Sequence, residues 1–110
     1  MFKRENRLVP GIGFSNSYLF TSPQFTLKEK KNGLTINRFG IVVSKKVDKR
    51  AVVRNRIKRF LRTTLVNLDR KMNTGHDILL VVKKEILNKT KEENLLTIEN
   101  ALGKTGLIRK

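Results

Sequence analysis

Residues 45–62 combine a dense positive charge with the spacing of an amphipathic helix. They hold nine basic residues and one acid, which is half of the chain's net charge of +16. Apolar residues nevertheless recur at three- and four-residue intervals, as they do in a helix with one buried side. At about 100° per residue, one side is shared by Val53, Ile57, Phe60, Leu61, Thr64 and Leu68. We therefore expect a helix over residues 51–69 that packs one face into a core.

The polar residues of this helix form a fixed array of cations. Lys58, Arg59, Arg62 and Asn55 fall opposite the apolar side, and Arg54 and Arg56 lie on its two flanks. No acid occurs between Asp48 and Asp69, whereas a merely solvated helix face usually alternates both signs. The array therefore favours a polyanion, above all a nucleic-acid backbone. A membrane surface would require an exposed apolar face, and we assign that face to the core.

The remaining composition excludes several classes of protein. The length of 110 residues indicates one domain, residues 1–110. With no cysteine and one histidine, neither a disulfide framework nor a zinc site is expected. No apolar run would span a membrane and no secretory signal opens the chain, so we expect a cytoplasmic protein. The nine acids are scattered, which predicts no catalytic or metal-binding cluster, and His76 is interpreted as a surface-loop residue.

The hydrophobic pattern predicts an α+β domain with the element order αββαβα and a central sheet of three or four strands covered by helices. The expected strands are 24–30, with a possible hairpin continuation at 34–36, then 38–44 and 77–83. The expected helices are 12–20, 51–69 and one that starts at Thr90, where Glu93 completes a capping box, and ends at Gly103. Phe25, Phe39 and Phe60 are assigned to the core.

Two motifs resemble the protein subunit of bacterial ribonuclease P. The first is Arg54-Asn55-Arg56-Ile57-Lys58-Arg59, which follows a run ending in Ser44-Lys45-Lys46. The second is Asn6-Arg7-Leu8 followed by Phe14 and Tyr18. The resemblance implies a left-handed β-α-β crossover (a ribosomal protein S5 domain 2-like fold), although about 98% of such crossovers between parallel strands are right-handed.

The resemblance also implies a function. The protein would bind a catalytic RNA and precursor transfer RNA as a subunit of the endoribonuclease that removes the 5′ leader. The RNA would carry the chemistry with its own Mg²⁺, so the protein alone would not be catalytic. It would need no cofactor of its own and no obligate protein partner.

The resemblance assigns site residues to two groups. Those expected to bind RNA are Lys45, Lys46, Arg54, Asn55, Arg56, Lys58, Arg59 and Arg62. Those expected to line a cleft for the leader strand are Phe14, Tyr18, Lys28 and Ser44. Tyr18 fits a core position as well as a cleft position. Several family members have an aromatic residue where this chain has Lys28, so this grip on the leader would be more electrostatic.

Two other functions are compatible with a small basic α/β domain. A ribosomal protein of similar build would bind RNA without an enzyme. A metal-dependent protein nuclease would cut RNA by itself, but the scattered acids argue against it.

Overall fold

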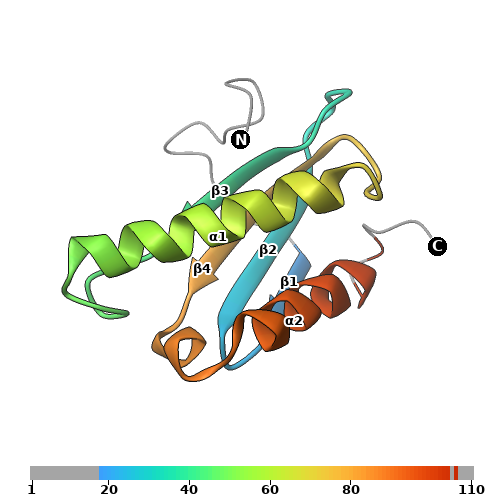
Figure 1. Cartoon of the computed structure of the whole chain (residues 1–110). Coiled ribbons are helices and arrows are strands. Elements are labelled where there is room, and N and C mark those ends of the chain that lie inside the picture. Colours follow the sequence, from blue (N-terminus) through green and yellow to red (C-terminus); the bar gives the residue numbers. More distant parts are fainter. Residues whose placement is uncertain (1–17, 105, 107–110) are drawn as a thin grey trace.

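The computed structural model describes residues 18–104 and residue 106. Four strands form one mixed sheet in the order β1-β2-β4-β3. Their bounds are Tyr18–Thr21 for β1, Phe25–Lys31 for β2, Arg38–Val42 for β3 and His76–Val82 for β4. The helices are α1 (Ala51–Asp69), the short 3-10 helix η2 (Lys84–Asn88) and α2 (Lys91–Lys104). Both α-helices lie on the same face of the sheet (Figure 1). The predicted α+β class is confirmed, and the fourth strand of the sheet is β1 and not a hairpin continuation at residues 34–36.

The crossover from β3 through α1 to β4 is left-handed. Strands β3 and β4 are parallel neighbours, and in Figure 1 both run toward the lower left with α1 in front of them. Strand β4 lies on the lower right of β3. If the picture is turned so that both strands point upward with α1 in front, β4 lies to the left of β3. A crossover in front of the sheet that leads to a strand on the left is left-handed. The handedness implied by the family resemblance is confirmed against the general rule.

The hydrophobic core lies between the two α-helices and the sheet. Alternate residues of β2 and β4 face the helices, among them Leu27, Ile78 and Leu80, which are fully buried. Helix α1 contributes Leu61, Leu65 and Leu68, as its spacing predicts, and α2 contributes Ile98 and Leu102.

The three predicted core phenylalanines differ in burial. Phe25 and Phe39 are buried as expected. Phe60 is only half-buried and packs against the edge of the core.

The prediction of a helix over residues 12–20 is wrong for its last three residues, which belong to strand β1. Ser22 closes a tight turn, because its backbone N–H and its hydroxyl both donate to the carbonyl oxygen of Phe25, at 2.9 and 3.0 Å. Residues 18–21 then pair antiparallel with residues 26–29 of β2. Ser22-Pro23 is thus a hairpin turn rather than a helix end. The rest of the predicted helix, including Phe14, lies outside the described residues.

The capping box of α2 is confirmed. The backbone N–H of Glu93 donates to the Thr90 hydroxyl, and the backbone N–H of Thr90 donates to the Glu93 carboxylate, both at 3.1 Å. Hydrogen bonding of the Glu93 carboxylate by the backbone N–H of Thr90, and next by its side chain, holds the pKa of Glu93 below its ordinary value. The helix continues through Gly103 to Lys104, one residue beyond the predicted end.

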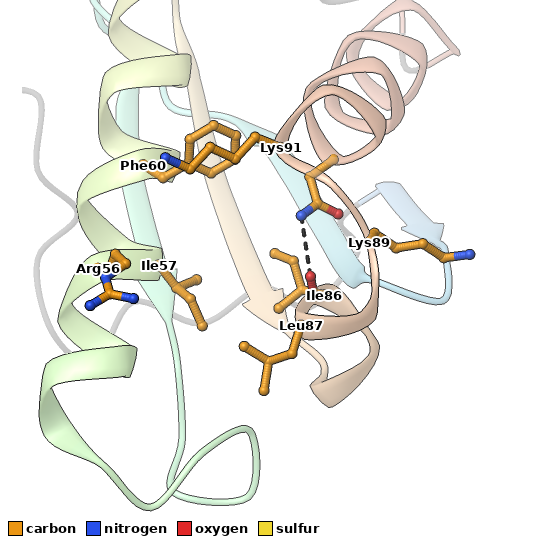
Figure 2. A pocket seen from close by; sticks show the side chains of 8 residues that line it. Arg56, Ile57, Phe60, Ile86, Leu87, Lys89 and Lys91 are labelled. Carbon is orange, nitrogen blue, oxygen red and sulfur yellow. Dashed lines mark hydrogen bonds between the residues drawn. The ribbon is translucent and has the colours of Figure 1, made fainter.

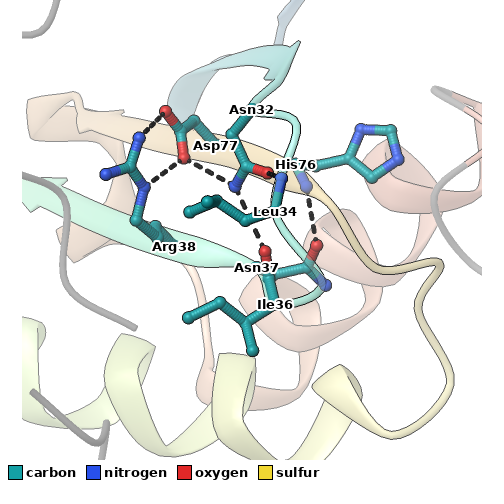
Figure 3. A network of polar contacts seen from close by, with 7 residues as sticks. All are labelled: Asn32, Leu34, Ile36, Asn37, Arg38, His76 and Asp77. Atoms are coloured by element: carbon teal, nitrogen blue, oxygen red, sulfur yellow. Dashed lines mark hydrogen bonds and ion pairs between the residues drawn. The ribbon is translucent and has the colours of Figure 1, made fainter. Parts of the chain in front are cut away.

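A buried polar network fixes the β2–β3 connection to the start of β4 (Figure 3). The Asp77 carboxylate is 1% exposed and accepts hydrogen bonds from Arg38 Nε and Nη2, both at 2.7 Å, and from Asn32 Nδ2 at 3.0 Å. Burial raises the pKa of Asp77, but the hydrogen bonds from Arg38 and Asn32 and the charges of Arg38 and Lys30 outweigh burial and hold it below its ordinary value.

His76 lies in β4 and not in a surface loop. Its backbone N–H donates to Asn37 Oδ1 at 3.0 Å, and its ring is hydrogen-bonded to the Glu29 carboxylate. Asn37 also donates to the Asp69 carboxylate at the end of α1. Residue 75, just before His76, has φ +87° and must be glycine, because a Cβ there would lie 2.9 Å from the carbonyl oxygen of Leu34.

Candidate nucleic-acid interface

The connection between β3 and α1 carries two cations to the surface. Lys45 and Lys46 are exposed in a turn that follows the end of β3. Val47, which is 3% exposed, anchors this turn in the core, and its backbone N–H donates to the carbonyl oxygen of Ser44 at 3.0 Å. One buried side chain therefore holds two lysines at a defined place beside the start of α1.

Asp48, the one acid among residues 45–62, is bound by the neighbouring Arg50. Asp48 Oδ1 accepts the backbone N–H of Arg50 at 2.8 Å, and the Arg50 guanidinium donates to both carboxylate oxygens at 3.0 and 2.9 Å. The Arg50 hydrogen bonds lower the pKa of Asp48 to about 2. The carboxylate stays ionised and shapes the turn into the helix, which begins without a side-chain cap.

Arg54 has a structural role that sequence patterning did not reveal. Its Nη1 donates to the backbone carbonyl oxygens of Asp48 and Lys49, at 3.0 and 2.8 Å. The side chain is half-buried and ties the first turn of α1 to the preceding loop. The guanidinium of Arg54, which was predicted to bind RNA, is therefore already partly used by contacts within the protein.

The other seven residues form what we call the basic surface: Lys45, Lys46, Asn55, Arg56, Lys58, Arg59 and Arg62. All are exposed except Lys58, which is half-buried. Within the residues that the structure describes, none of these cations forms an ion pair with a carboxylate. A rigid helix thus presents uncompensated charge, and such charge is attracted to a polyanion.

The basic surface wraps around α1 and does not lie on one line. Arg56 is on the flank that faces α2, since it lines a pocket together with Phe60 and residues of η2 and α2. At 100° per residue, Lys58 and Arg62 lie on the opposite flank, toward the free edge of β3, and Arg59 points away from the sheet.

Of the four predicted leader-cleft residues, Lys28 lies across the sheet from the basic surface, whereas Ser44 directly precedes Lys45. Lys28 is half-buried on β2, where its neighbours in register are Leu19 and Leu79. It alternates with Leu27, which faces the helices, so Lys28 lies on the face that α1 and α2 leave uncovered. Ser44 is exposed two residues beyond β3. Tyr18 lies in β1, opposite Glu29 in register, and Phe14 is outside the described residues.

The described acids and histidine are dispersed. In residues 18–104 no three His, Asp or Glu side chains gather in a way that could hold a metal ion. None of the helices in this part of the chain is both long enough and apolar enough to cross a membrane.

Comparison with known sequences identifies relatives along nearly the whole chain. The family model of ribonuclease P matches residues 2–106. A ribonuclease P protein component from Clostridium botulinum (strain Langeland) is 40% identical over 104 residues, covering 90% of this chain and 89% of its own. A ribonuclease P protein component from Haemophilus influenzae is 37% identical over 89 residues, covering 77% and 74% of the two chains.

Solved structures share the fold. The ribonuclease P protein of Staphylococcus aureus superposes with a TM-score of 0.78 at 24% identity and covers 87% of each chain. The ribonuclease P protein of Thermotoga maritima gives a TM-score of 0.72 at 26% identity, covering 81% of this chain and 84% of its own.

Proposed function

This chain belongs to the ribonuclease P protein family, and from that membership we propose that it binds the catalytic RNA subunit of ribonuclease P and the 5′ leader of precursor transfer RNA. The observation that carries the proposal is the basic surface, which is held on a helix anchored in the core by Leu61, Leu65 and Leu68. Because the helix backbone is ordered before binding, only the side-chain entropy of these cations, about 0.5–1.5 kcal/mol each, is lost when they meet phosphates.

Four of the described acids support a division of labour between protein and RNA. The carboxylate of Asp77 is bound by Arg38, that of Asp48 by Arg50, that of Glu29 by His76 and that of Glu93 by the backbone N–H of Thr90. Carboxylates committed to the fold in this way are poor candidates for holding catalytic metal ions. In our proposal the RNA therefore carries the Mg²⁺-assisted hydrolysis, and the cytoplasmic holoenzyme, not the protein alone, releases the leader.

We propose that the leader runs along the face of the sheet that the helices leave uncovered. Lys28 lies near the centre of this face, in a row across the sheet with Leu79 and Gly40. Gly40 adds no side chain, and Val42 beside it is 44% exposed. A cation among small and apolar groups can hold a phosphate while tolerating any base, which suits an enzyme with many precursors.

Replacing Lys28 by alanine tests this path. We expect the affinity of the reconstituted holoenzyme for leader-bearing precursor to fall roughly 10-fold, as for the loss of one charged hydrogen bond of about 1.5 kcal/mol. Affinity for mature transfer RNA should stay unchanged, because it has no leader. The slope of log affinity against log salt should flatten by about 0.7 for the precursor, the value for one phosphate of a single strand.

The matched control is Lys31→Ala, which removes the same charge from the same strand. Lys31 is exposed, and because side chains alternate along β2 it lies on the opposite face of the sheet from Lys28. A loss of equal size for precursor and mature transfer RNA in Lys28→Ala would contradict the proposed path.

A further inference from the structure

A small pocket opens between α1 and the chain that links η2 to α2 (Figure 2). Its volume is about 170 Å³. Helix α1 supplies Ile57 and Phe60 to one wall, and η2 supplies Ile86 and Leu87 to the other. Leu87 is 42% exposed although it is a large apolar residue. The walls are therefore apolar and partly open to solvent.

The size of the pocket limits what can enter it. A dry cavity of about 150 Å³ is enough to bind one benzene molecule, whereas pockets for drug-sized ligands measure about 300–1,000 Å³. This pocket therefore accommodates a single six-membered ring. Phe60 and Leu87 on opposite walls offer such a ring apolar contact on both sides.

The surroundings of the pocket are cationic. Arg56 lies one helical turn before Phe60, and in Figure 2 Lys91 extends from α2 toward Phe60. Neither forms an ion pair within the described residues. Lys89 also belongs to the lining, although its amine extends away from the pocket in this view, and its charge acts on Glu93. An occupant that carries negative charge beside its ring would be favoured.

An unsatisfied acceptor is also present in the lining. Asn94 is 5% exposed, and its Nδ2 donates to the carbonyl oxygen of Ile86 at 3.2 Å. Its Oδ1 is buried and has no hydrogen-bond partner among the residues that the structure describes. Because solvent does not reach this Oδ1, it gives an occupant no contact, and the apolar walls and the flanking cations define the site.

We propose that this pocket receives one unpaired pyrimidine nucleotide of the RNA partner. The ring lies between Phe60 and Leu87, and the adjoining phosphates are bound by Arg56 and Lys91. A purine has two fused rings, and its second ring would lie outside the apolar walls and gain less contact. The inference rests on the proposed function, and it adds a base-binding site to a surface otherwise described by phosphate contacts alone.

Other occupants fit the observations less well. An aromatic side chain of a protein partner would fill the ring space but would bring no charge to Arg56 and Lys91. Residues 1–9 of this chain contain a phenylalanine, yet they carry three basic residues against one acid and would be repelled.

Photo-cross-linking of the unaltered protein tests the site directly. The RNA subunit is transcribed with 5-iodocytidine or 5-iodouridine, irradiated in the complex and digested, and the adducts are located by mass spectrometry. We expect adducts on the peptides that contain Phe60 or Leu87. Adducts confined to other segments would overturn the inference.

A pocket-filling variant provides the second test. Leu87→Trp should occupy the ring space and weaken binding of the RNA subunit by about fivefold to a hundredfold, the range for one stacked base. Leu96→Trp is the control, because Leu96 is 58% exposed on α2 and does not line the pocket. Thermal melting of both variants verifies that they fold.

The outcomes separate this inference from the proposed function. If Leu87→Trp binds RNA like the unaltered protein while Arg59→Ala with Arg62→Ala weakens binding, the pocket inference fails and the proposed function stands; a protein occupant would give this result. If the arginine variant also binds normally, the role of Arg59 and Arg62 fails as well; if the protein binds no RNA subunit at all, the proposed function fails and the pocket inference with it.

Discussion

Replacing Arg59 and Arg62 together by alanine is expected to weaken binding of the RNA subunit on the order of 100-fold. Both guanidinium groups are exposed on α1 and have no carboxylate partner within the described residues. Each charged hydrogen bond to a phosphate contributes about 1.5–3 kcal/mol, so two of them at the lower limit account for this loss. The slope of log affinity against log salt should flatten by about 1.4–1.8, which corresponds to two phosphates.

Lys71→Ala is the control for loss of a surface cation elsewhere, and the result for each single arginine variant is compared with it. Lys71 is exposed just beyond the other end of α1, away from the basic surface. The circular dichroism spectrum and melting temperature of the double variant should match those of the unaltered protein, because neither arginine contacts the core. An unchanged affinity with an unchanged salt slope would assign Arg59 and Arg62 to the merely solvated surface.

Replacing Asp77 by alanine is expected to lower the free energy of unfolding by about 3 kcal/mol, the largest loss among the variants proposed. The variant leaves Arg38 and Asn32 without their acceptor at a site where the carboxylate is 1% exposed. Arg38 is 20% exposed and can still reach water, so we expect the lower end of the range known for broken buried pairs. Urea unfolding followed by circular dichroism at pH 7 measures the difference.

The pH dependence of this loss follows from the lowered pKa of Asp77. A carboxyl group whose pKa is lower in the folded state stabilises that state above its unfolded pKa, near 4, and loses this contribution as the pH falls through the folded value. The unaltered protein and Asp77→Ala should therefore converge in free energy of unfolding in acid. Asp48→Ala is the comparison, since the Asp48–Arg50 pair is at the surface and should cost far less. Equal losses for the two variants would contradict the role of the buried network.

Elements with a strong local signal were predictable from sequence. The bounds of α1 follow from its apolar spacing, and the Thr90–Glu93 capping box marks the start of α2 from four residues alone. Strand β1 was missed because its identity depends on pairing with β2, and Ser22-Pro23 fits both a helix end and a hairpin turn.

Features that join distant segments were not predictable. His76 meets Glu29 and Asn37 across 47 and 39 residues, so only the folded sheet reveals that it is not a loop residue. The hydrogen bonds of Arg54 to the loop carbonyls depend on the turn that Asp48 builds. The pocket arises because the crossover places α1 beside η2, an element without a clear sequence pattern.

The site was predicted in part. The residues of the basic surface share one helix and its preceding turn, as expected, and their binding of RNA stays a prediction. That the sheet separates this surface from Lys28 follows only from the topology, because the alternation of β2 places Lys28 opposite the helices. An RNA that touches both would have to pass around the edge of the sheet.

Release of the 5′ leader from a precursor transfer RNA tests the central claim most directly. The RNA that copurifies with the tagged protein is sequenced, transcribed and assayed with precursor and Mg²⁺, alone and together with RNA-free protein. We expect one discrete RNA that releases the leader with the protein present, and no cleavage by the protein alone. Copurification of ribosomal RNA without leader release, or Mg²⁺-dependent cleavage by the RNA-free protein, would contradict this account.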